Sequence, residues 1–419
     1  MNNAYYKISE VANLLSVSKD TLRRWDNSGK LTPIRHPINN YRVYHKDQLM
    51  IFEEFQRISR SNWESEERVS RDHHYTSIEI FAGCGGLALG LKYAGFEHLL
   101  LNEIDKKAST TLQNNIPSWN VINDDIHNVC FKEYKHKVDL LSGGFPCQAF
   151  SYAGNKMGFN DTRGTLFFEF ARAVKEIEPK MFLAENVRGL MNHDNGRTLS
   201  TIKSVIYDIG YTLVEPKVLK AIYYKVPQKR ERLFLIGIRN DLYNDDLFRF
   251  PDPYHAVLTM KDALKKGVLY SCDVPLSLGQ KYPDRKKEIL NHVPPGGCWR
   301  NLPVDLQKEY MQKSFYLGGG KTGMARRLSW DEPSLTLTCA PAQKQTERCH
   351  PEETRPLTVR EYARIQTFPD NWQFYGSISS QYKQIGNAVP VNLAATVGRS
   401  LIRALNKIYQ AETNKLRSP

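Results

Sequence analysis

The segment SGGFPCQAFS, residues 142–151, places a single cysteine, Cys147, between a proline and the glutamine Gln148. It follows the apolar run VDLLS, which is typical of a buried strand that ends at the two glycines. We therefore expect Cys147 on the loop that leaves this strand, and in open α/β sheets ligands bind at that edge. A free cysteine is more often a small buried apolar residue, so a reactive role depends on what else reaches the same edge.

Other reactive side chains stand at the ends of further expected strands. The segment KMFLAENVRGL places Glu185 and Asn186 at the end of a strand, on the same edge as Cys147. The segment VPQKRERLFLIGIR places three polar residues directly before a strand, namely Gln228, Arg230 and Arg232. Because side chains alternate along an extended segment, these three are expected on one side. The alternative is a solvated, charged entry to the strand.

A second set of features describes a nucleoside site. The first expected strand ends in FAGCGG, whose glycines at 83, 85 and 86 allow a tight turn and a close backbone approach to a ligand. The next strand ends in Glu103, which can accept hydrogen bonds from ribose hydroxyls, and NDDI places Asp125 where a carboxylate can accept from an adenine amino group. The spacing fits neither the dinucleotide nor the triphosphate motif. These points favour S-adenosylmethionine, an adenosine cofactor without a pyrophosphate.

Six motifs occur in a fixed order: FAGCGG, PCQ, ENV, QKRER, RPLTVREYARIQTFPD and QIGNAVP. In these motifs the chain resembles the DNA (cytosine-5) methyltransferase family, over nearly all of residues 76–240 and 355–400. The resemblance implies that S-adenosylmethionine is surrounded by Phe81, Gly83, Gly85, Glu103, Ile104, Asp125, Ile126, Leu166, Asn387 and Val389. It implies that the catalytic residues are Cys147, Gln148, Glu185, Asn186, Arg230 and Arg232. Many family members carry an aromatic residue where this chain has Ile104, so an aromatic contact with the adenine is not expected there.

The resemblance also implies a reaction. Carbon 5 of cytosine is a poor nucleophile, and addition of the Cys147 thiolate to carbon 6 makes an enamine-like ring that can attack a sulfonium methyl group. A protonated Glu185 donates to ring nitrogen 3, and Arg232 holds the exocyclic oxygen. Because a paired cytosine hides its ring, the base must be extruded from the duplex. The sequence does not identify the base that removes the carbon 5 proton.

From Thr76 onward, apolar strands alternate with helical stretches. The strand candidates are SIEIF, HLLLNE, VDLLS, KMFLAE and LFLIGI. This alternation predicts an α/β fold, with a mostly parallel doubly wound sheet as the catalytic domain over residues 76–240. Residues 356–419 are expected to return to that domain, starting as a cofactor-side loop at QIGNAVP and finishing as a helix.

Residues 241–355 lack the alternation of strands and helices and are rich in glycine and proline. By resemblance they form a loop-rich target-recognition domain, and the alternative is a structural insertion. Arg326 and Arg327 lie in the stretch RRLSWDEPSLTLT, where family members place a Thr-Leu or similar pair close to the extruded base. Arginines here are expected to bind DNA, meeting phosphates before base edges.

Residues 1–58 form a separate candidate unit. Ser9 and Ser18 are placed to cap two short helices and Gly29 to end the second, which predicts a helix-turn-helix. With the possible wing at NNYRVY, the segment resembles the winged DNA-binding domains of MerR-type regulators. The expected DNA contacts are Lys19, Thr21, Arg23, Arg24 and Arg42.

We expect this N-terminal domain to bind a separate operator at the promoter of the protein's own gene. One alternative is a protein-interaction or packing module, and another is a domain that only helps to hold the methylation target. Residues 59–75 are expected to be a linker.

Composition agrees with a nucleic-acid partner, here double-stranded DNA. The chain has 58 Lys and Arg against 45 Asp and Glu, a net charge of +13, and a pI near 9.2. Its seven cysteines show neither a C-x-x-C pair nor zinc-like spacing, so we expect no metal and a reducing, cytoplasmic location. No signal-peptide pattern and no apolar run near the roughly 20 residues of a spanning helix are found, so no membrane association is expected.

Two rival functions remain open at this point. One is a DNA-binding regulator whose methyltransferase body is inactive, which the intact PCQ, ENV and QKRER motifs argue against. The other is an RNA cytosine methyltransferase, which the N-terminal helix-turn-helix and the loop-rich region argue against. A restriction endonuclease acting on the same DNA site is a further partner that the resemblance allows.

Overall fold

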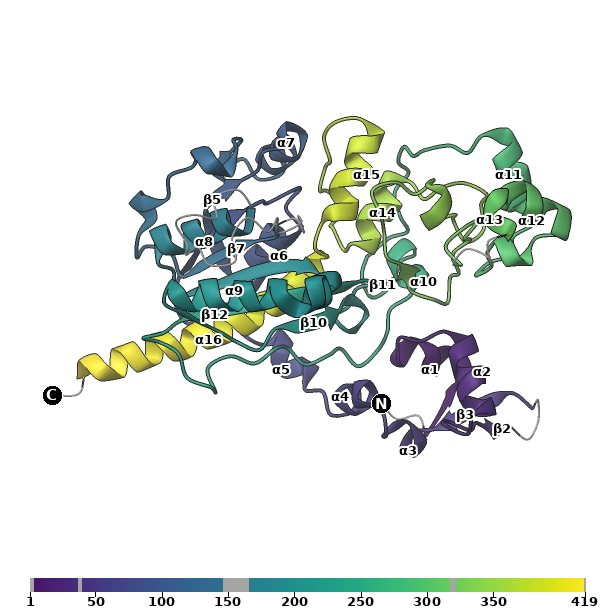
Figure 1. Cartoon of the computed structure of the whole chain (residues 1–419), viewed down its shortest axis with the longest axis horizontal. Coiled ribbons are helices and arrows are strands. Elements are labelled where there is room, and N and C mark those ends of the chain that lie inside the picture. Colours follow the sequence, from purple (N-terminus) through teal and green to yellow (C-terminus); the bar gives the residue numbers. More distant parts are fainter. Residues whose placement is uncertain (1–3, 37–39, 146–165, 317–321, 418–419) are drawn as a thin grey trace. The chain divides into compact units, whose positions relative to one another are not determined.

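The computed structural model describes residues 4–36, 40–145, 166–316 and 322–417, and it divides into two compact units (Figure 1). The first unit comprises Met1–Ser65, Ala221–Arg230 and Asp252–Asp370, and the second comprises Glu66–Lys220, Glu231–Pro251 and Asn371–Pro419. These units do not follow the expected boundaries. Residues 221–230 and 356–370 fold with residues 252–355 in the first unit, and residues 241–251 fold with the second unit.

The second unit is built on a sheet of eight strands within the described residues, in the order β10-β12-β8-β7-β4-β5-β6 with β9 paired to β12. The strands are β4 (Tyr75–Ile80), β5 (Phe96–Asn102), β6 (Val121–Ile122), β7 (Leu140–Gly143), β8 (Met181–Val187), β9 (Tyr211–Leu213), β10 (Lys217–Lys220) and β12 (Glu231–Arg239). Strands β4 to β8 are parallel, whereas β12 is antiparallel to its neighbours. All five expected strands are present, so the mostly parallel α/β fold is confirmed.

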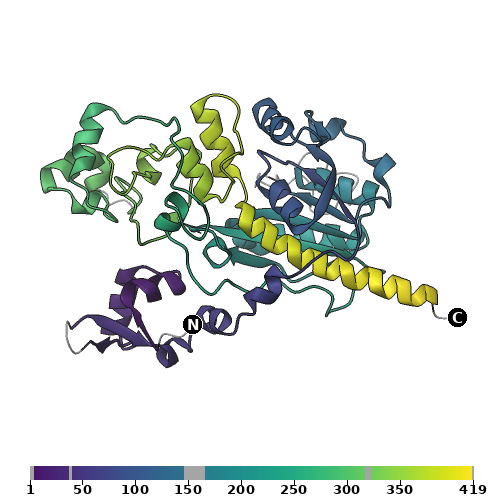
Figure 2. The same ribbon diagram turned by 180° about the vertical axis from the view of Figure 1, so that it is seen from behind.

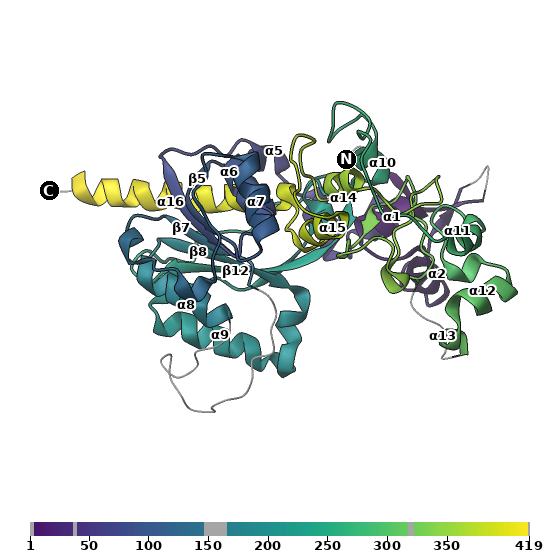
Figure 3. The same cartoon turned by 90° about the horizontal axis from the view of Figure 1, so that it is seen from above.

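Helices cover both faces of this sheet. Figure 3 shows α8 (Leu166–Ile177) and α9 (Arg197–Asp208) on one face, and α6 (Gly86–Ala94) and α7 (Lys106–Asn115) on the other. Apolar side chains of α8 recur every three or four residues, and Phe170 and Val174 pack with Leu141, Phe182 and Ile202 in one buried cluster. This periodicity explains why residues 166–177 form a helix on a parallel sheet.

Helix α16 (Val391–Arg417) packs against α6 through glycines, and Figure 2 shows it across one face of the sheet. A Cβ on Gly90 would lie 2.3 Å from the Cβ of Ala394, and one on Gly398 would lie 2.6 Å from the Cβ of Ala94. The expected cofactor-side loop at QIGNAVP is only partly a loop. Its first four residues end α15 (Ile378–Asn387), and the turn to α16 follows.

The N-terminal part of the first unit has the expected helix-turn-helix. Helices α1 (Ile8–Leu14) and α2 (Lys19–Asn27) precede the wing strands β2 (Ile34–Arg35) and β3 (Arg42–His45), which form a sheet with β1 (Tyr5–Lys7). Ser18 caps α2 by accepting a hydrogen bond from the Thr21 N–H at 2.9 Å, and Gly29 has a φ of 72° beyond its end. The expectation for Ser9 is wrong, because α1 starts directly after β1 with Lys7 at the cap.

Residues 59–75 contain ordered, packed structure. After α3 (Lys46–Leu49) and α4 (Glu53–Ser59), the short helix α5 (Trp63–Glu67) carries two buried side chains. The Trp63 ring lies 5.3 Å from that of Tyr254, and the Glu66 carboxylate accepts hydrogen bonds from Arg249 and Arg403. The segment is therefore not the free linker that its polar composition predicts.

The rest of the first unit is loop-rich, as expected. Its short elements are β11 (Gln228–Lys229), α10 (Met260–Leu264), α11 (Asp284–Asn291), α12 (Val304–Met311), α13 (Lys313–Tyr316), β13 (Ser334–Leu335) and α14 (Val359–Ile365). A small apolar core that includes Leu290, Trp299 and Met311 holds the helices together. Among all residues that the structure describes, no helix combines the length and apolarity needed to cross a bilayer.

The α6–α16 packing predicts the cost of one methyl group. Gly90→Ala places its Cβ against Ala394 and the Val391 carbonyl oxygen, so it should destabilise the protein by about 1–3 kcal/mol through overpacking. Thermal unfolding should show a lower midpoint for this variant. Gly189→Ala is the matched control, because a Cβ there meets no atom within 4 Å. Equal midpoints for the two variants would contradict the packing account.

Candidate active site

A cavity of about 940 Å³ lies at the carboxyl ends of the parallel strands of the second unit. The described residues that line it lie at or after the ends of β4, β5, β6, β7 and β8, and others come from β12, from the starts of α6, α7 and α8 and from the end of α15. Of the ten residues expected around the cofactor, nine line this cavity: Phe81, Gly83, Glu103, Ile104, Asp125, Ile126, Leu166, Asn387 and Val389.

The chain leaves β4 through a sharp turn. Phe81 has a φ of 57°, a left-handed conformation that bulky residues rarely adopt and that is found mostly at functional sites. Gly83 and Gly85 also have positive φ values, 56° and 88°. Gly85 does not line the cavity. A Cβ there would lie 2.7 Å from Leu112 and 3.0 Å from Trp372, so its lack of a side chain serves packing, which differs from the expected cofactor contact.

Glu103 is fixed by the backbone around it. One carboxylate oxygen accepts from the Gly83 N–H at 2.7 Å and the other from the Asp105 N–H at 2.8 Å. Burial raises the pKa of Glu103, and these hydrogen bonds oppose that shift. Each oxygen keeps a lone pair for a further donor, which suits a pair of ribose hydroxyls. Its neighbour Ile104 is 65% exposed at the rim.

The opposite part of the cavity holds a buried ion pair. Arg232 Nε lies 2.7 Å from Glu185 Oε1, and each side chain is only 12% exposed. Strands β8 and β12 pair antiparallel here with Arg232 opposite Val187, which makes Arg232 and Glu185 diagonal neighbours on one face of the sheet. Burial lowers the pKa of Arg232, and the charge of Glu185 opposes this shift. A Cβ on Gly144 would lie 3.0 Å from Glu185 Oε2, so the glycine at this position allows the backbone just after β7 to lie close to the carboxylate.

Asn186 connects this pair to the cysteine loop. Its Nδ2 donates to the carbonyl oxygen of Phe145 at 2.9 Å, and its Oδ1 accepts from the Val187 N–H. Phe145 stands two positions before Cys147. Cys147 and Gln148 themselves lie outside the described residues. Asn186 therefore fixes the backbone from which the cysteine loop departs.

Comparisons with known proteins decide the family. The model for "C-5 cytosine-specific DNA methylase" matches residues 75–403, and the model for "MerR family regulatory protein" matches residues 7–44. The chain belongs to the C-5 cytosine-specific DNA methylase family. It is thus a DNA (cytosine-5) methyltransferase whose cofactor is S-adenosylmethionine, with a MerR-type helix-turn-helix at its N-terminus.

Individual relatives agree over nearly the whole chain. The type II methyltransferase M.Eco47II of Escherichia coli is 66% identical over 403 residues, 96% of this chain and 96% of that protein. The type II methyltransferase M.PspPI of Psychrobacter sp. (strain TA137) is 61% identical over 402 residues, 96% of this chain and 97% of that protein. The solved S. pombe Dnmt2 methyltransferase has a TM-score of 0.54 at 17% identity, covering 80% of this chain and 100% of that one, which supports the fold alone.

The cavity of the methyltransferase fits its cofactor. Glu103 offers carboxylate oxygens at the end of β5, Asp125 offers another after β6, and the glycine turn after β4 exposes backbone between them. Phe81, Leu166 and Val389 contribute apolar surface. These carboxylates suit an adenosine whose tail is uncharged or cationic. They suit a pyrophosphate less well, because the negative charges of carboxylates and phosphates repel each other.

Among the cavity residues that the sequence did not predict, Glu79 and His127 are titratable side chains close to expected ligands. Glu79, 1% exposed within the apolar strand β4, accepts a hydrogen bond from the Ser142 hydroxyl at 3.2 Å, and burial raises its pKa to about 8. The sequence feature that could have identified Glu79 is a single acidic residue in an otherwise apolar strand, just before the glycine turn. His127 lies beside Asp125 at the rim of the cavity. Its signal was a titratable residue two positions after an expected ligand.

The expected alignment of the QKRER residues is wrong. Gln228 and Arg230 belong to the first unit and are buried, whereas Arg232 belongs to β12 of the second. The Gln228 side chain donates to Gln366 and accepts from the Leu337 N–H, each at 2.9 Å. Arg230 donates to the Leu337 carbonyl at 3.3 Å. The two residues thus hold β11 to the segment after β13, and the catalytic role expected for Arg230 stays a prediction.

Arg327 is also placed differently from the expectation. Its side chain is buried, and its guanidinium donates to four backbone carbonyls and one hydroxyl: Leu290, Val293, His350, Glu352 and Thr354. Because these acceptors occupy the guanidinium, the expected contact of Arg327 with DNA is wrong. Arg326 is largely buried, and one of its nitrogens lies 3.7 Å from a Glu332 oxygen.

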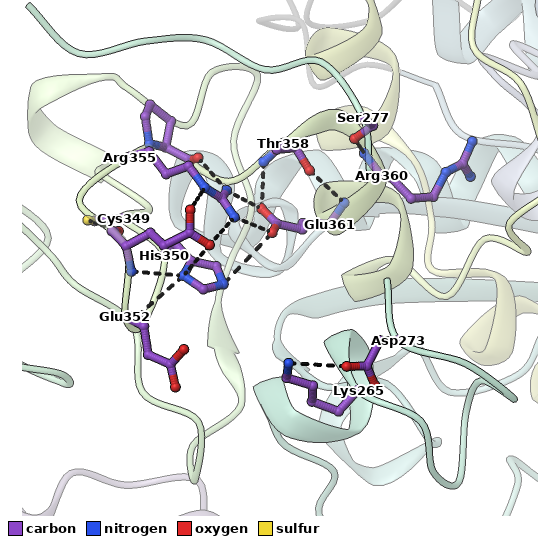
Figure 4. A network of polar contacts seen from close by, with 12 residues as sticks. Lys265, Asp273, Ser277, Cys349, His350, Glu352, Arg355, Thr358, Arg360 and Glu361 are labelled. Atoms are coloured by element: carbon purple, nitrogen blue, oxygen red, sulfur yellow. Dashed lines mark hydrogen bonds and ion pairs between the residues drawn. The ribbon is translucent and has the colours of Figure 1, made fainter. Parts of the chain in front are cut away.

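The motif RPLTVRE of the methyltransferase is held by a network of polar contacts (Figure 4). Arg355 donates to both oxygens of Glu361 at 2.8 Å, and Glu361 also accepts from the Thr358 N–H at 2.7 Å, which caps α14. Burial lowers the pKa of His350, whose Nε2 lies 3.8 Å from Glu361. This network gives the motif a structural role in the first unit.

The residues of the N-terminal domain that are expected to contact DNA differ in their exposure and in the partners that their side chains already have. Arg23 and Arg24 are exposed on α2, with Asp20 and Thr21 as partners on the same helix. Arg42 of the wing is paired with Asp26 at 3.0 Å. Lys19, the first residue of α2, lies 2.9 Å from Glu332 in the loop-rich part of the same unit.

The position of Asn186 predicts a defect in the rate of reaction that spares cofactor binding. Asn186→Ala removes the donor to the Phe145 carbonyl, so the cysteine loop loses its fixed starting point. Displacing a reactive group in this way costs up to about 100-fold in rate. Single-turnover methyl transfer should slow accordingly, while calorimetry shows unchanged affinity for S-adenosylhomocysteine. A normal rate, or a loss confined to cofactor affinity, would refute this role.

Proposed function

We propose that this methyltransferase modifies a cytosine extruded from duplex DNA through a covalent adduct with Cys147. The proposal rests on one observation: two sets of polar side chains lie at different positions along the same cavity. Glu185 and Arg232 stand at strands β8 and β12, Glu103 and Asp125 follow β5 and β6, and β7 and β4 lie between them in the sheet. Base and cofactor can thus occupy neighbouring parts of the cavity, with the Cys147 loop leaving β7 between them.

The chain's residues then divide the chemistry. S-adenosylmethionine supplies an electrophilic methyl group when bound. The Cys147 thiolate adds to carbon 6 of cytosine, which raises the electron density at carbon 5. Glu185 in its protonated form donates to nitrogen 3, and Arg232 offsets charge that develops on the exocyclic oxygen. After transfer, loss of the carbon 5 proton restores the ring and releases the thiolate.

The biological setting follows from the relatives' names. The curated relatives are type II methyltransferases, so we propose that this enzyme protects one specific DNA sequence from a restriction endonuclease that acts on the same site. We propose a cytoplasmic location, because the substrate is the cell's DNA and the six cysteines that the structure describes are all free thiols.

For the N-terminal domain we propose binding of an operator at the gene's own promoter. The exposed Arg23 and Arg24 on α2 support this, because this helix enters the major groove in helix-turn-helix proteins. The contact of Lys19 with Glu332, and that of the Tyr223 hydroxyl with the Leu14 carbonyl at 2.8 Å, favour the second candidate. In that view the domain helps the target-recognition region to hold the methylation site.

Substitution of Glu185 tests the chemistry. Glu185→Gln keeps the size and the hydrogen bonding but loses the transferable proton, so the rate should fall by roughly 10²–10⁴, as is typical of general acid catalysis. Single-turnover methyl transfer to duplex DNA measures this rate. Glu215→Gln removes a carboxylate of an exposed ion pair with Lys203 and serves as the control. An unchanged rate for Glu185→Gln with normal cofactor affinity would disprove the role.

Substitution of Arg23 separates the two N-terminal functions. We expect Arg23→Ala to weaken binding to a fragment of the gene's own promoter more than binding to random DNA, and to leave methylation intact. Footprinting and bisulfite sequencing measure the two effects. Arg60→Ala, at an exposed position after α4, controls for loss of one charge. Reduced methylation without any promoter protection would favour the target-holding function.

A further inference from the structure

Asp125 receives two hydrogen bonds from one neighbour. The backbone N–H of His127 donates to Asp125 Oδ1 at 3.0 Å, and His127 Nδ1 lies 2.6 Å from the same oxygen. Both residues line the cavity, and both side chains are about half exposed, 45% for Asp125 and 49% for His127. Because an ionised carboxylate only accepts, the ring nitrogen Nδ1 is the donor.

The short turn that carries both residues is clamped by α8. Arg172 on α8 donates to the carbonyl oxygens of Ile126 at 2.8 Å and Val129 at 3.1 Å, on either side of His127. Arg172 also holds Glu169 at 2.7 Å, and Glu169 Oε1 lies 3.8 Å from Nε2 of His127. The His127 ring is therefore flanked by carboxylates at both of its nitrogens, on a turn fixed from a helix of the core.

We infer that His127 is a positioning residue for the adenine end of the cofactor site, and that it makes the site select a 6-amino purine. The inference rests on the proposed role of Asp125. The backbone N–H and Nδ1 of His127 both donate to Oδ1 of Asp125. No other described residue donates a hydrogen bond to Oδ2 of Asp125. Oδ2 is left to accept from the adenine amino group, in an orientation that His127 fixes.

The selectivity follows from the charge of Asp125. The pKa of Asp125 is lowered, first by the backbone N–H of His127 and next by its side chain, so the carboxylate is held in its accepting form. A 6-oxo purine presents a carbonyl oxygen where adenine presents a donor, and an oxygen facing a carboxylate is repelled. A site built around such an acceptor discriminates more strongly than an apolar pocket does.

Calorimetry with two ligands tests the inference on the full-length protein. S-adenosylhomocysteine carries the amino group, and S-inosylhomocysteine carries oxygen at the same position. His127→Ala should weaken binding of the first by about five- to tenfold, the scale of one hydrogen bond, and leave binding of the second nearly unchanged. His127→Asn should restore most of the loss, because the asparagine Nδ2 can occupy the place of Nδ1.

The controls separate failure of this inference from failure of the proposed site. His74→Ala removes another exposed histidine that pairs with a carboxylate, Glu97, away from the cavity, and it should change neither affinity. Asp125→Asn keeps a capping side chain but loses the charge, and it should reduce the discrimination between the two ligands. Unchanged discrimination in Asp125→Asn would overturn the adenine site itself.

If Asp125→Asn loses the discrimination and His127→Ala does not, the site stands and the role of His127 is overturned. A loss of affinity for both ligands in His127→Ala, or no rescue by His127→Asn, would also overturn it, because either result indicates a general disturbance of the turn. Thermal unfolding midpoints of all variants show whether the fold is retained, and a lowered midpoint in His127→Ala alone would indicate a purely structural role.

Discussion

The parallel order of β8, β7, β4, β5 and β6 is the constraint on which the site depends. Strands that run in one direction end at one edge, so segments more than 100 residues apart in the chain meet there. Glu185, Glu103 and Asp125 are brought to one cavity by this order alone. The antiparallel strand β12 extends the arrangement, because its pairing with β8 adds Arg232 beside Glu185.

Much of this architecture could be predicted from local patterns. The five principal strands are recognisable in the sequence as apolar runs that end at a glycine or at a polar residue. In a parallel sheet the ends of such strands lie together. Six of the nine expected cofactor residues that line the cavity follow β4, β5 or β6 for this reason, whereas Leu166, Asn387 and Val389 were expected from the family resemblance alone. Gly85, the tenth, is the exception, since a glycine required for close packing against Leu112 and Trp372 has the same appearance in a sequence as one required by a ligand.

The remaining features depend on tertiary contacts that no local pattern reveals. Alternation along QKRER predicted one face, but the segment is divided between two units after Arg230. Arg327 looks like a phosphate contact until its guanidinium is found among backbone carbonyls inside the first unit. His127 could not be identified as a partner of Asp125 from spacing alone, because its role depends on the clamp that Arg172 supplies from α8.

Trapping of the covalent adduct with DNA tests whether Cys147, on the segment that follows β7, is the nucleophile. Fluorine at carbon 5 cannot leave as the proton does, so the adduct should persist on duplex DNA in which 5-fluorocytosine replaces cytosine. With S-adenosylmethionine present, mass spectrometry of the denatured wild-type protein should show a DNA adduct on the peptide that contains residue 147. Cys147→Ala should show none. An adduct that persists in this variant, or that maps to another cysteine, would contradict the account.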